Sequence, residues 1–423
     1  MATTDSTPGI FANAPDSDPR RDAIVVGASL AGCTTAILLA RAGARVTVVE
    51  KSPDPAAFKR ICTHFIQASA VPTLERIDLL EPMLAAGAVR SQVTAWTRWG
   101  WIEAPEEEAG LCINLRRSVL DPMIRAAAAS EPGVEMLLGQ SAERLLWDGE
   151  TVAGVVVRDR DGNETQLWAP LTVGADGRDS RVAELSGVPV KTRPHGRIAY
   201  GGYFEGATPP TAPRTAMWML DPQWCAAFPT DSGLTFYAAM VTKKRLPEFK
   251  RDPEAALVRI ISDVPEAPPI ADGTAIEPVL GKIDMLNRAR QQTAPGLALV
   301  GDAALAIDPL FGVGCGWALQ SAEWLSDAIA PALAGEEPLT DGLGRYRKRH
   351  TRELRGHAWM LHDYATGRRL VPAEKIFFAA AVRDPRVATA FDLIGTRRVK
   401  PIGEMARTMP RAIAANARHA LAA

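Results

Sequence analysis

The first hydrophobic positions of the chain follow a strand, turn, helix, strand pattern. Residues 23–26 are a short apolar run with β-branched side chains, typical of a strand buried on both faces of a parallel sheet. An alanine- and leucine-rich helix is predicted from the following turn to about Ala42, and Gly43 ends it. A second apolar strand is predicted over residues 45–49. The pattern therefore predicts a complete βαβ unit.

The same kind of apolar strand returns much later in the chain. Residues 171–173 and 297–300 are short apolar runs that each lead into a glycine turn. From residue 190 to about 285, prolines and aromatic residues are frequent, and polar and apolar positions alternate as in antiparallel strands. Helical patterning covers most of residues 341–423. We predict an α/β fold: a Rossmann-like nucleotide-binding domain built from discontinuous segments, a substrate domain with an antiparallel or mixed sheet, and a helical C-terminal cap.

These patterns also predict the domain boundaries. The predicted parts are a disordered tail over residues 1–20, a nucleotide-binding domain over 21–90, 112–189 and 286–340, a substrate domain over 91–111 and 190–285, and a C-terminal helical region over 341–423.

Composition and charge narrow the classes of partner. The chain has 423 residues, of which 47% are hydrophobic, and 48 basic residues balance 49 acidic ones. This balance gives no reason to expect nucleic acid as a partner, and membrane contact is not expected. The five cysteines are scattered, and the first twenty residues resemble no signal peptide, so we expect reduced thiols and a cytoplasmic protein.

The turn after the first strand has the chemistry of a phosphate-binding loop. Its sequence, GASLAG, occupies residues 27–32, and Ser29 replaces the middle glycine of the usual G-x-G-x-x-G pattern. Small residues allow the backbone to approach a pyrophosphate, and the helix N-terminus offers free N–H groups. Glu50 ends the second strand, where a carboxylate can accept the hydroxyls of a ribose.

Two further glycine motifs follow the later strands, GADGRDS at residues 174–180 and GDAALAIDPLFGVGCG at 301–316. With GASLAG, their order and spacing resemble the class A FAD-dependent monooxygenases typified by para-hydroxybenzoate hydroxylase. The last motif also resembles the flavin halogenases and the geranylgeranyl reductases. The resemblance covers roughly residues 22–350 and implies FAD as cofactor, with NADPH or NADH as the reductant.

The resemblance assigns roles to individual residues. Glu50 holds the adenosine ribose, Arg117 in the stretch LRRSVLD reaches the pyrophosphate, and Asp302 accepts the ribityl hydroxyls. His64, in a segment that crosses the flavin in the family, is a candidate proton donor or anchor for a substrate hydroxyl, although it could equally bind a backbone carbonyl. The implied FAD-binding residues are Gly27, Ser29, Gly32, Glu50, Arg60, Arg117, Asp176, Gly177, Asp302, Pro309, Gly312 and Gly314.

The implied reaction is the hydroxylation or epoxidation of an apolar, aromatic or polyketide-like small molecule with molecular oxygen, through a flavin C4a-hydroperoxide. No metal is required. The aromatic residues predicted either to line the substrate pocket or to fill the core are Trp99, Trp101, Trp218, Trp224 and Tyr237.

Ala183 stands where the family often has an arginine, which leaves the handling of the nicotinamide nucleotide unsettled, and a separate flavin reductase is one possible partner.

Three alternatives to a monooxygenase stay open. A halogenase would use a lysine beside the flavin tunnel, and the W-x-W-x-I-P stretch of tryptophan halogenases is absent. A reductase of isoprenoid double bonds would need no oxygen. A non-catalytic FAD-binding protein would react with neither reductant nor oxygen.

Overall fold

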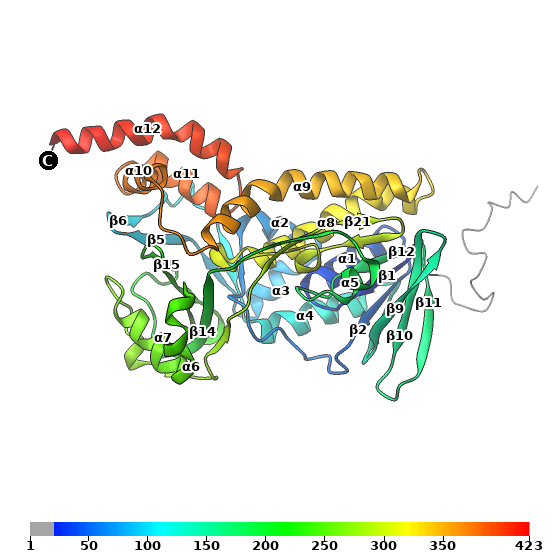
Figure 1. Cartoon of the computed structure of the whole chain (residues 1–423). Coiled ribbons are helices and arrows are strands. Elements are labelled where there is room, and N and C mark those ends of the chain that lie inside the picture. The colour runs from blue at the N-terminus through cyan, green and yellow to red at the C-terminus, as the bar shows by residue number, and fades with distance from the viewer. Residues whose placement is uncertain (1–20, 423) are drawn as a thin grey trace, which may run out of the picture.

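A twisted, mainly parallel sheet forms the centre of the cofactor half of the protein. The computed structural model describes residues 21–422 (Figure 1), so the predicted tail lies outside the described residues. The strands follow the order β21-β22-β12-β1-β2-β8, and all neighbours are parallel except β21 and β22. The strand bounds are β1 (Ala23–Val26), β2 (Val46–Glu50), β8 (Val134–Leu138), β12 (Leu171–Gly174), β21 (Thr293–Ala294) and β22 (Leu297–Leu299).

The two faces of this sheet are covered by different layers. Ala23 and Val25 point into a core shared with helices, whereas Ile24 and Val26 point into a second core. The helices of the first core include α1 (Leu30–Arg41), α4 (Arg117–Ser130) and α8 (Val313–Leu333). The second core is closed by the antiparallel strands β9 (Ser141–Asp148), β10 (Thr151–Arg158) and β11 (Glu164–Trp168).

An eight-stranded mixed sheet forms the other half. Its order is β18-β14-β17-β16-β15-β5-β6, with β19 also pairing with β14. The pairs are antiparallel except β5 and β15, which are parallel. The bounds are β5 (Val93–Thr97), β6 (Gly100–Ile102), β14 (Arg197–Glu205), β15 (Thr215–Met219), β16 (Trp224–Pro229), β17 (Thr235–Thr242), β18 (Thr274–Ala275) and β19 (Leu280–Lys282).

Side chains along this sheet alternate between its two faces. On β15, Met217 and Met219 pack into the core shared with the cofactor half, while Ala216 and Trp218 pack into a separate core. That separate core is closed by α7 (Pro253–Ser262), with α6 (Leu246–Arg251) beside it (Figure 1). Hence one face of the sheet is turned toward the cofactor half and the other toward α7.

The hairpin of β5 and β6 carries two tryptophans, Trp99 and Trp101, which would share a face if the strand period of two continued through the turn. Trp99 lies in the two-residue turn between β5 and β6, and its side chain packs against the core of the cofactor half. Trp101 lies on β6 opposite Trp96, and both pack against the α7 core. The turn residue does not continue the period of two, which explains the difference.

Short elements join the two halves. They are α2 (Val71–Arg76), α3 (Leu80–Ala85), α5 (Arg181–Ser186), β3 (Phe65–Ile66), β4 (Val89–Ser91), β7 (Cys112–Asn114), β13 (Val190–Arg193), β20 (Asn287–Arg290), β23 (Leu305–Ala306) and the 3₁₀ turns η1 (Ala68–Ala70), η2 (Asp231–Gly233), η3 (Lys243–Arg245), η4 (Ile270–Asp272), η5 (Gly301–Ala303) and η6 (Leu310–Gly312).

The C-terminal region is helical, as predicted. It consists of α9 (Leu339–Tyr364), α10 (Pro372–Ala381), α11 (Pro385–Gly395) and α12 (Pro401–Ala422). In Figure 1, α9 lies along α8, and α12 extends outward beyond α10 and α11. Within residues 21–422, no helix combines the length and apolar character needed to cross a lipid bilayer. The predicted α/β fold class, with its mixed sheet and helical C-terminal region, is confirmed.

Candidate functional site

Glu50 ends β2 with its carboxylate held by two backbone N–H groups. The N–H of Ala28 donates to Oε2 and the N–H of Ser52 donates to Oε1, both at 2.9 Å. The side chain is therefore fixed beside the turn that leads into α1. Two lone pairs remain for ligand hydroxyls, since each carboxylate oxygen can accept more than one hydrogen bond.

The two glycine positions of this turn, Gly27 and Gly32, are packed too closely to accept a side chain. A Cβ on Gly32 would lie 1.7 Å from the carbonyl oxygen of Gly27, and Gly27 has a φ of +107°. Ser29 is the N-cap of α1 but makes no capping hydrogen bond with its side chain, and the first turn of α1 contains no acidic residue. The N-terminal N–H groups of α1 therefore have no side-chain cap from Ser29 and no acidic neighbour to compete with a diphosphate.

A row of charged residues on α4 supports this turn. Arg117 forms an ion pair of 2.6 Å with Asp121 and donates to the Ser29 hydroxyl at 2.8 Å, although both partners of the ion pair are buried. One turn further along, Arg125 donates to the carbonyl oxygens of Ala28 at 3.2 Å and Ala57 at 2.9 Å. Burial alone would lower the pKa of Arg117, but Asp121, Cys62 and Cys315 together outweigh burial and raise that pKa, so the guanidinium is charged.

The third motif places Asp302 beside the same cluster. Lys59 donates to Asp302 at 3.2 Å. Burial by itself would raise the pKa of Asp302, yet the charges of Lys59 and Arg178 hold it below its usual value. A Cβ on Gly314 would have no neighbour closer than Asp302, at 4.0 Å, so the backbone at the start of α8 is open to a ligand.

The turn before α8 is held by a buried pair. His195 Nε2 lies 2.6 Å from Asp308, whose other carboxylate oxygen accepts the N–H of Leu310 at 2.8 Å. Pro309 follows directly, and then Phe311 and Gly312 adopt φ values of +62° and +61°. A non-glycine residue in this region is uncommon and marks a turn shaped for a purpose.

The second motif serves chiefly as a brace. Asp176 accepts hydrogen bonds from the Ser180 hydroxyl at 2.5 Å and the Val182 N–H at 3.0 Å, so both its oxygens are engaged inside their own turn. Gly177, with a φ of +83°, has open space around its Cβ position. Its neighbour Arg178 donates to the carbonyl oxygen of Ile307 at 2.6 Å and so ties the second motif to the third.

Together these residues fit FAD: a carboxylate for a ribose, a bare helix N-terminus with a buried arginine for the diphosphate, and an open glycine turn for the flavin. The FAD binding domain family matches residues 20–358 of the sequence. The chain belongs to this family. The flavoprotein is an FAD-dependent oxidoreductase by this membership, and the family suspected from the three motifs is confirmed.

Relatives with three different named activities resemble it. Digeranylgeranylglycerophospholipid reductase 1 of Methanopyrus kandleri is 25% identical over 354 residues, which are 79% of this chain and 87% of that protein. Kynurenine 3-monooxygenase of Salinispora tropica is 26% identical over 378 residues, covering 79% and 81%. The structure of the flavin-dependent brominase Bmp2 has a TM-score of 0.74 at 18% identity, covering 95% of this chain and all 100% of its own, and supports the fold alone.

We call the turn before α8, residues 309–312, the flavin turn. His64 lies in the segment before β3, between this turn and the mixed sheet. Its neighbour Phe65 touches the flavin turn, where a Cβ on Gly312 would lie 2.6 Å from the Phe65 ring. His64 is fully buried, stacks on Tyr203 with ring centroids 5.5 Å apart, and meets Phe236 edge-on at 5.4 Å. The Tyr203 hydroxyl lies 3.2 Å from Nδ1.

The second ring nitrogen of His64 is one of several buried polar side-chain atoms that have no partner among the described residues. Nε2 is buried and has no hydrogen-bond partner among the described residues. Burial lowers the pKa of His64 to about 3, so the ring is neutral at physiological pH. A buried polar atom without a partner is costly and is best explained by a ligand or water that satisfies it.

The structure does not bring the five predicted pocket aromatics together. Trp224 lies on the cofactor-facing side of the mixed sheet and meets Phe311 of the flavin turn, with ring centroids 5.3 Å apart. Trp218 and Tyr237 lie on the opposite side, in the α7 core, and Trp101 packs against them there. Trp99 is in the hairpin turn.

Several contributors were not picked out from the sequence, and one predicted residue has no described contact. Arg60 is exposed and makes no hydrogen bond or ion pair within residues 21–422, whereas the adjacent Lys59 contacts Asp302. Arg125 and Asp121 follow Arg117 at intervals of four residues, a helical spacing that could have been found. The residues that contribute to the site but were not picked out from the sequence are Lys59, Asp121, Arg125, His195, Tyr203, Phe228, Phe236 and Asp308.

The residue before Arg117 connects the site to the mixed sheet. Arg116 forms an ion pair of 2.7 Å with Asp231, a buried residue at the turn between β16 and β17. Asn114 donates to the carbonyl oxygen of Pro229 at the end of β16, at 2.9 Å. The start of α4 therefore contacts both halves of the molecule.

Proposed function

We propose that the flavoprotein is a monooxygenase that hydroxylates or epoxidises a small apolar molecule, with an aromatic compound carrying a hydroxyl or amino group as the favoured substrate. The observation that carries this proposal is the unpartnered Nε2 of His64 inside a cage of aromatic rings. The cage suits a flat apolar ring, and the single free ring nitrogen suits one polar substituent on it.

His64 would orient the substrate by accepting a hydrogen bond from its O–H or N–H group. Because its ring is neutral, Nε2 accepts the substrate's O–H or N–H when Nδ1 carries the ring proton and donates it to the Tyr203 oxygen. Burial raises the pKa of Tyr203, so the phenol stays protonated and can hold that partner position. This hydrogen bond polarises the substrate's O–H or N–H bond and makes the substrate ring richer in electrons. Bound FAD, held by Glu50, Arg117 and Asp302, would supply the activation of oxygen.

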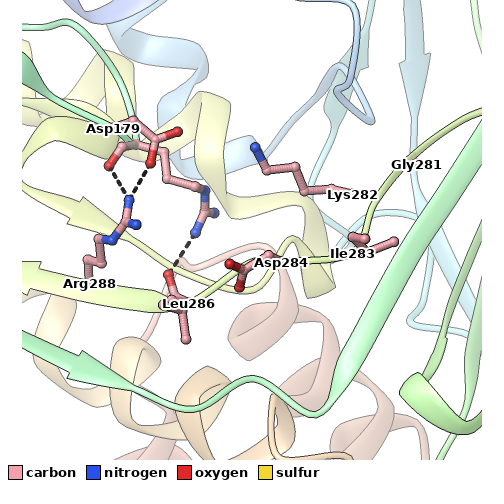
Figure 2. A pocket seen from close by; sticks show the side chains of 8 residues that line it. Asp179, Gly281, Lys282, Ile283, Asp284, Leu286 and Arg288 are labelled. Atoms are coloured by element: carbon pink, nitrogen blue, oxygen red, sulfur yellow. Dashed lines mark hydrogen bonds and ion pairs between the residues drawn. The ribbon is translucent and has the colours of Figure 1, made fainter. Parts of the chain in front are cut away.

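The proposed reductant is NADH or NADPH, and a cavity offers a place for its phosphates. The cavity has a volume of about 310 Å³ and lies between the second motif and the mixed sheet. Figure 2 shows Arg288 on one side, paired with Asp179, and Lys282 on the other. Lys282 forms no ion pair with the described residues, so its charge is available to an anion. K282E should raise the KM for NADPH several-fold and leave FAD affinity unchanged.

The second candidate function is the reduction of an isoprenoid double bond. It is favoured by the likeness to the Methanopyrus kandleri reductase along most of that protein. Such a reaction consumes reductant without oxygen and needs no polar anchor for an aromatic substituent. A halogenase would instead show dependence on halide.

The deciding experiment follows one labelled oxygen atom. The FAD-loaded protein is given NADPH, isotopically labelled O₂ and a panel of hydroxy- and amino-substituted aromatic compounds, and the products are analysed by mass spectrometry. We expect a product carrying one labelled oxygen atom. Substrate reduction under strict exclusion of oxygen would overturn the proposal in favour of the reductase, and a product that forms only with added bromide or chloride would favour the halogenase.

A further inference from the structure

Two cysteines from opposite ends of the FAD site meet beside Arg117. Cys62 lies three residues beyond Lys59, and Cys315 lies in the first turn of α8. Their sulfur atoms are 3.6 Å apart although 253 residues separate them in the sequence. Arg117 approaches both, with Nη1 at 3.5 Å from the Cys62 sulfur and 3.9 Å from the Cys315 sulfur.

We infer that Cys62 and Cys315 form a redox-active pair, which hydrogen peroxide oxidises to a disulfide that fastens residues 51–64 to the start of α8. Peroxide is the product released whenever a reduced flavoprotein reacts with oxygen but transfers none of it. The inference goes beyond the proposed function, because these thiols take no part in oxygen transfer, and peroxide can be supplied from outside.

The two sulfur atoms are suited to different steps. The hydrogen bond with Cys315, followed by the charges of Arg117 and Lys59, lowers the pKa of Cys62, while the same hydrogen bond and burial raise the pKa of Cys315. Cys62 is partly exposed and Cys315 is buried behind it. Cys62 is therefore the thiolate that peroxide meets first, and Cys315 is the thiol that resolves the product.

The chemistry balances in two steps. The Cys62 thiolate attacks one oxygen of hydrogen peroxide; the O–O bond breaks, a sulfenic acid forms, and the hydroxide that leaves takes up the proton released when the Cys62 thiol ionised, giving one water. The Cys315 sulfur then attacks the Cys62 sulfur, the S–O bond breaks and a second water leaves with the thiol proton. The two thiols lose two electrons and two protons, and peroxide is reduced to water. The sulfur atoms need to approach by only about 1.5 Å to reach bonding distance.

The remaining cysteines provide an internal comparison. Cys33, Cys112 and Cys225 are fully buried, and burial raises the pKa of each, to about 12 for Cys33 and Cys225. Each therefore stays a protonated, inaccessible thiol. Selective oxidation of two thiols out of five is expected under mild peroxide.

The disulfide should also change how the site binds its cofactor. It removes the thiolate charge that faces Arg117, so the guanidinium, which remains paired with Asp121, has one negative neighbour fewer to compete with an anionic ligand. We expect the oxidised protein to bind FAD several-fold more tightly than the reduced protein. This readout needs no catalytic turnover.

The test uses the FAD-loaded protein and peptide mapping. The protein is treated with a few equivalents of hydrogen peroxide, alkylated, digested without reductant and analysed by mass spectrometry. We expect a cross-linked pair of peptides containing Cys62 and Cys315, two hydrogen atoms lighter than the separate peptides, with the other three cysteines alkylated.

Two variants separate the steps. In C315A, Cys62 should gain oxygen atoms as sulfenic or sulfinic acid with no cross-link, whereas in C62A neither residue should react. C225A is the matched control and should cross-link like the native protein. Peroxide treatment that leaves both thiols free, or that oxidises Cys62 in the native protein without a cross-link, overturns the inference. Unchanged FAD affinity after cross-linking would overturn its consequence for the cofactor. None of these outcomes depends on whether the enzyme is a monooxygenase.

Discussion

The two sheets of this flavoprotein carry their polar groups in opposite ways. The parallel sheet gathers charges at the carboxyl ends of its strands, where Glu50 accepts two backbone N–H groups, Asp302 pairs with Lys59, and Arg117 pairs with Asp121. The mixed sheet turns a mainly apolar face to the same space, where Tyr203 lies beside His64 among aromatic rings.

The difference indicates a division of labour. A charged cofactor is held by many redundant contacts, so each charge contributes to affinity. An apolar substrate is held by shape, so one polar atom decides its orientation. Substitutions in the two regions should therefore differ in kind: the first should change cofactor affinity and the second should change turnover.

The largest effect is expected at the polar atom of the substrate face. H64Q should lower kcat by about 100-fold, because the imidazole that positions the substrate is lost, while FAD affinity stays unchanged. Steady-state assays and FAD titration measure the two quantities. Y203F, which removes only the hydroxyl partner of Nδ1, should show a smaller loss in the same direction. Equal turnover of H64Q and the native protein would break the comparison.

The next effect is expected on the cofactor side. R117M should weaken FAD binding by about 30-fold and lower the free energy of unfolding by about 3 kcal/mol, because the buried Asp121 would lose its ion-pair partner and keep only the N–H of Lys59. Fluorescence titration and urea unfolding test both. R117K keeps the charge but loses the forked geometry of the guanidinium. Its FAD affinity and its free energy of unfolding should therefore lie between those of R117M and the native protein. An R117M protein that binds FAD with native affinity would contradict the assignment.

A third prediction uses a feature that both regions share, a buried neutral histidine. Burial lowers the pKa values of His64 and His350 to about 3, against about 6.5 in an unfolded chain. Below pH 6.5 the unfolded chain therefore binds protons that the folded protein does not, and stability falls toward pH 3 by up to about 1.4 kcal/mol per pH unit for each residue.

Urea unfolding at pH 7 and pH 5 measures this slope. H350Q on α9 and H64Q beside the mixed sheet should each make the pH dependence shallower by a similar amount. Carboxylates titrate in all three proteins alike, so the difference from the native protein isolates each histidine. A slope that neither variant changes would show that the two rings are protonated in the folded state.

The smallest effects should sharpen the distinction between the two faces of the mixed sheet. W224F, on the face toward the flavin turn, should change the substrate KM a few-fold. W218F, on the α7 face, loses the hydrogen bond from the indole to the Pro265 carbonyl oxygen and should lower the free energy of unfolding by about 1 kcal/mol, with an unchanged KM. The reverse pattern would place the substrate on the other face.

The cofactor half was largely predictable because its signals are local. Buried strands followed by glycine turns appear as contiguous stretches, and Gly27 and Glu50 take their roles from positions within one βαβ unit. The ladder of Arg117, Asp121 and Arg125 repeats every four residues and was also accessible to sequence reasoning.

The substrate face was not predictable in the same way. Alternation shows that Met217 and Trp218 point to opposite sides, but only the position of α7 reveals which side is closed. The cage around His64 draws on Tyr203 from β14 and Phe236 from β17, strands that pair only in the folded sheet. The contact between Cys62 and Cys315 is likewise set by tertiary structure alone.

Arg116 and Arg117 are neighbours in the chain, yet Arg116 binds Asp231 at the β16–β17 turn of the mixed sheet, and Arg117 binds Ser29 in the glycine turn before α1. Any shift of the first helical turn of α4 moves both. Cofactor affinity and the position of the β16–β17 turn are therefore thermodynamically linked, and the linkage is reciprocal. A substitution at Asp231 should therefore change the affinity for FAD. Binding of FAD should in turn reduce the motion of the β16–β17 turn in the mixed sheet.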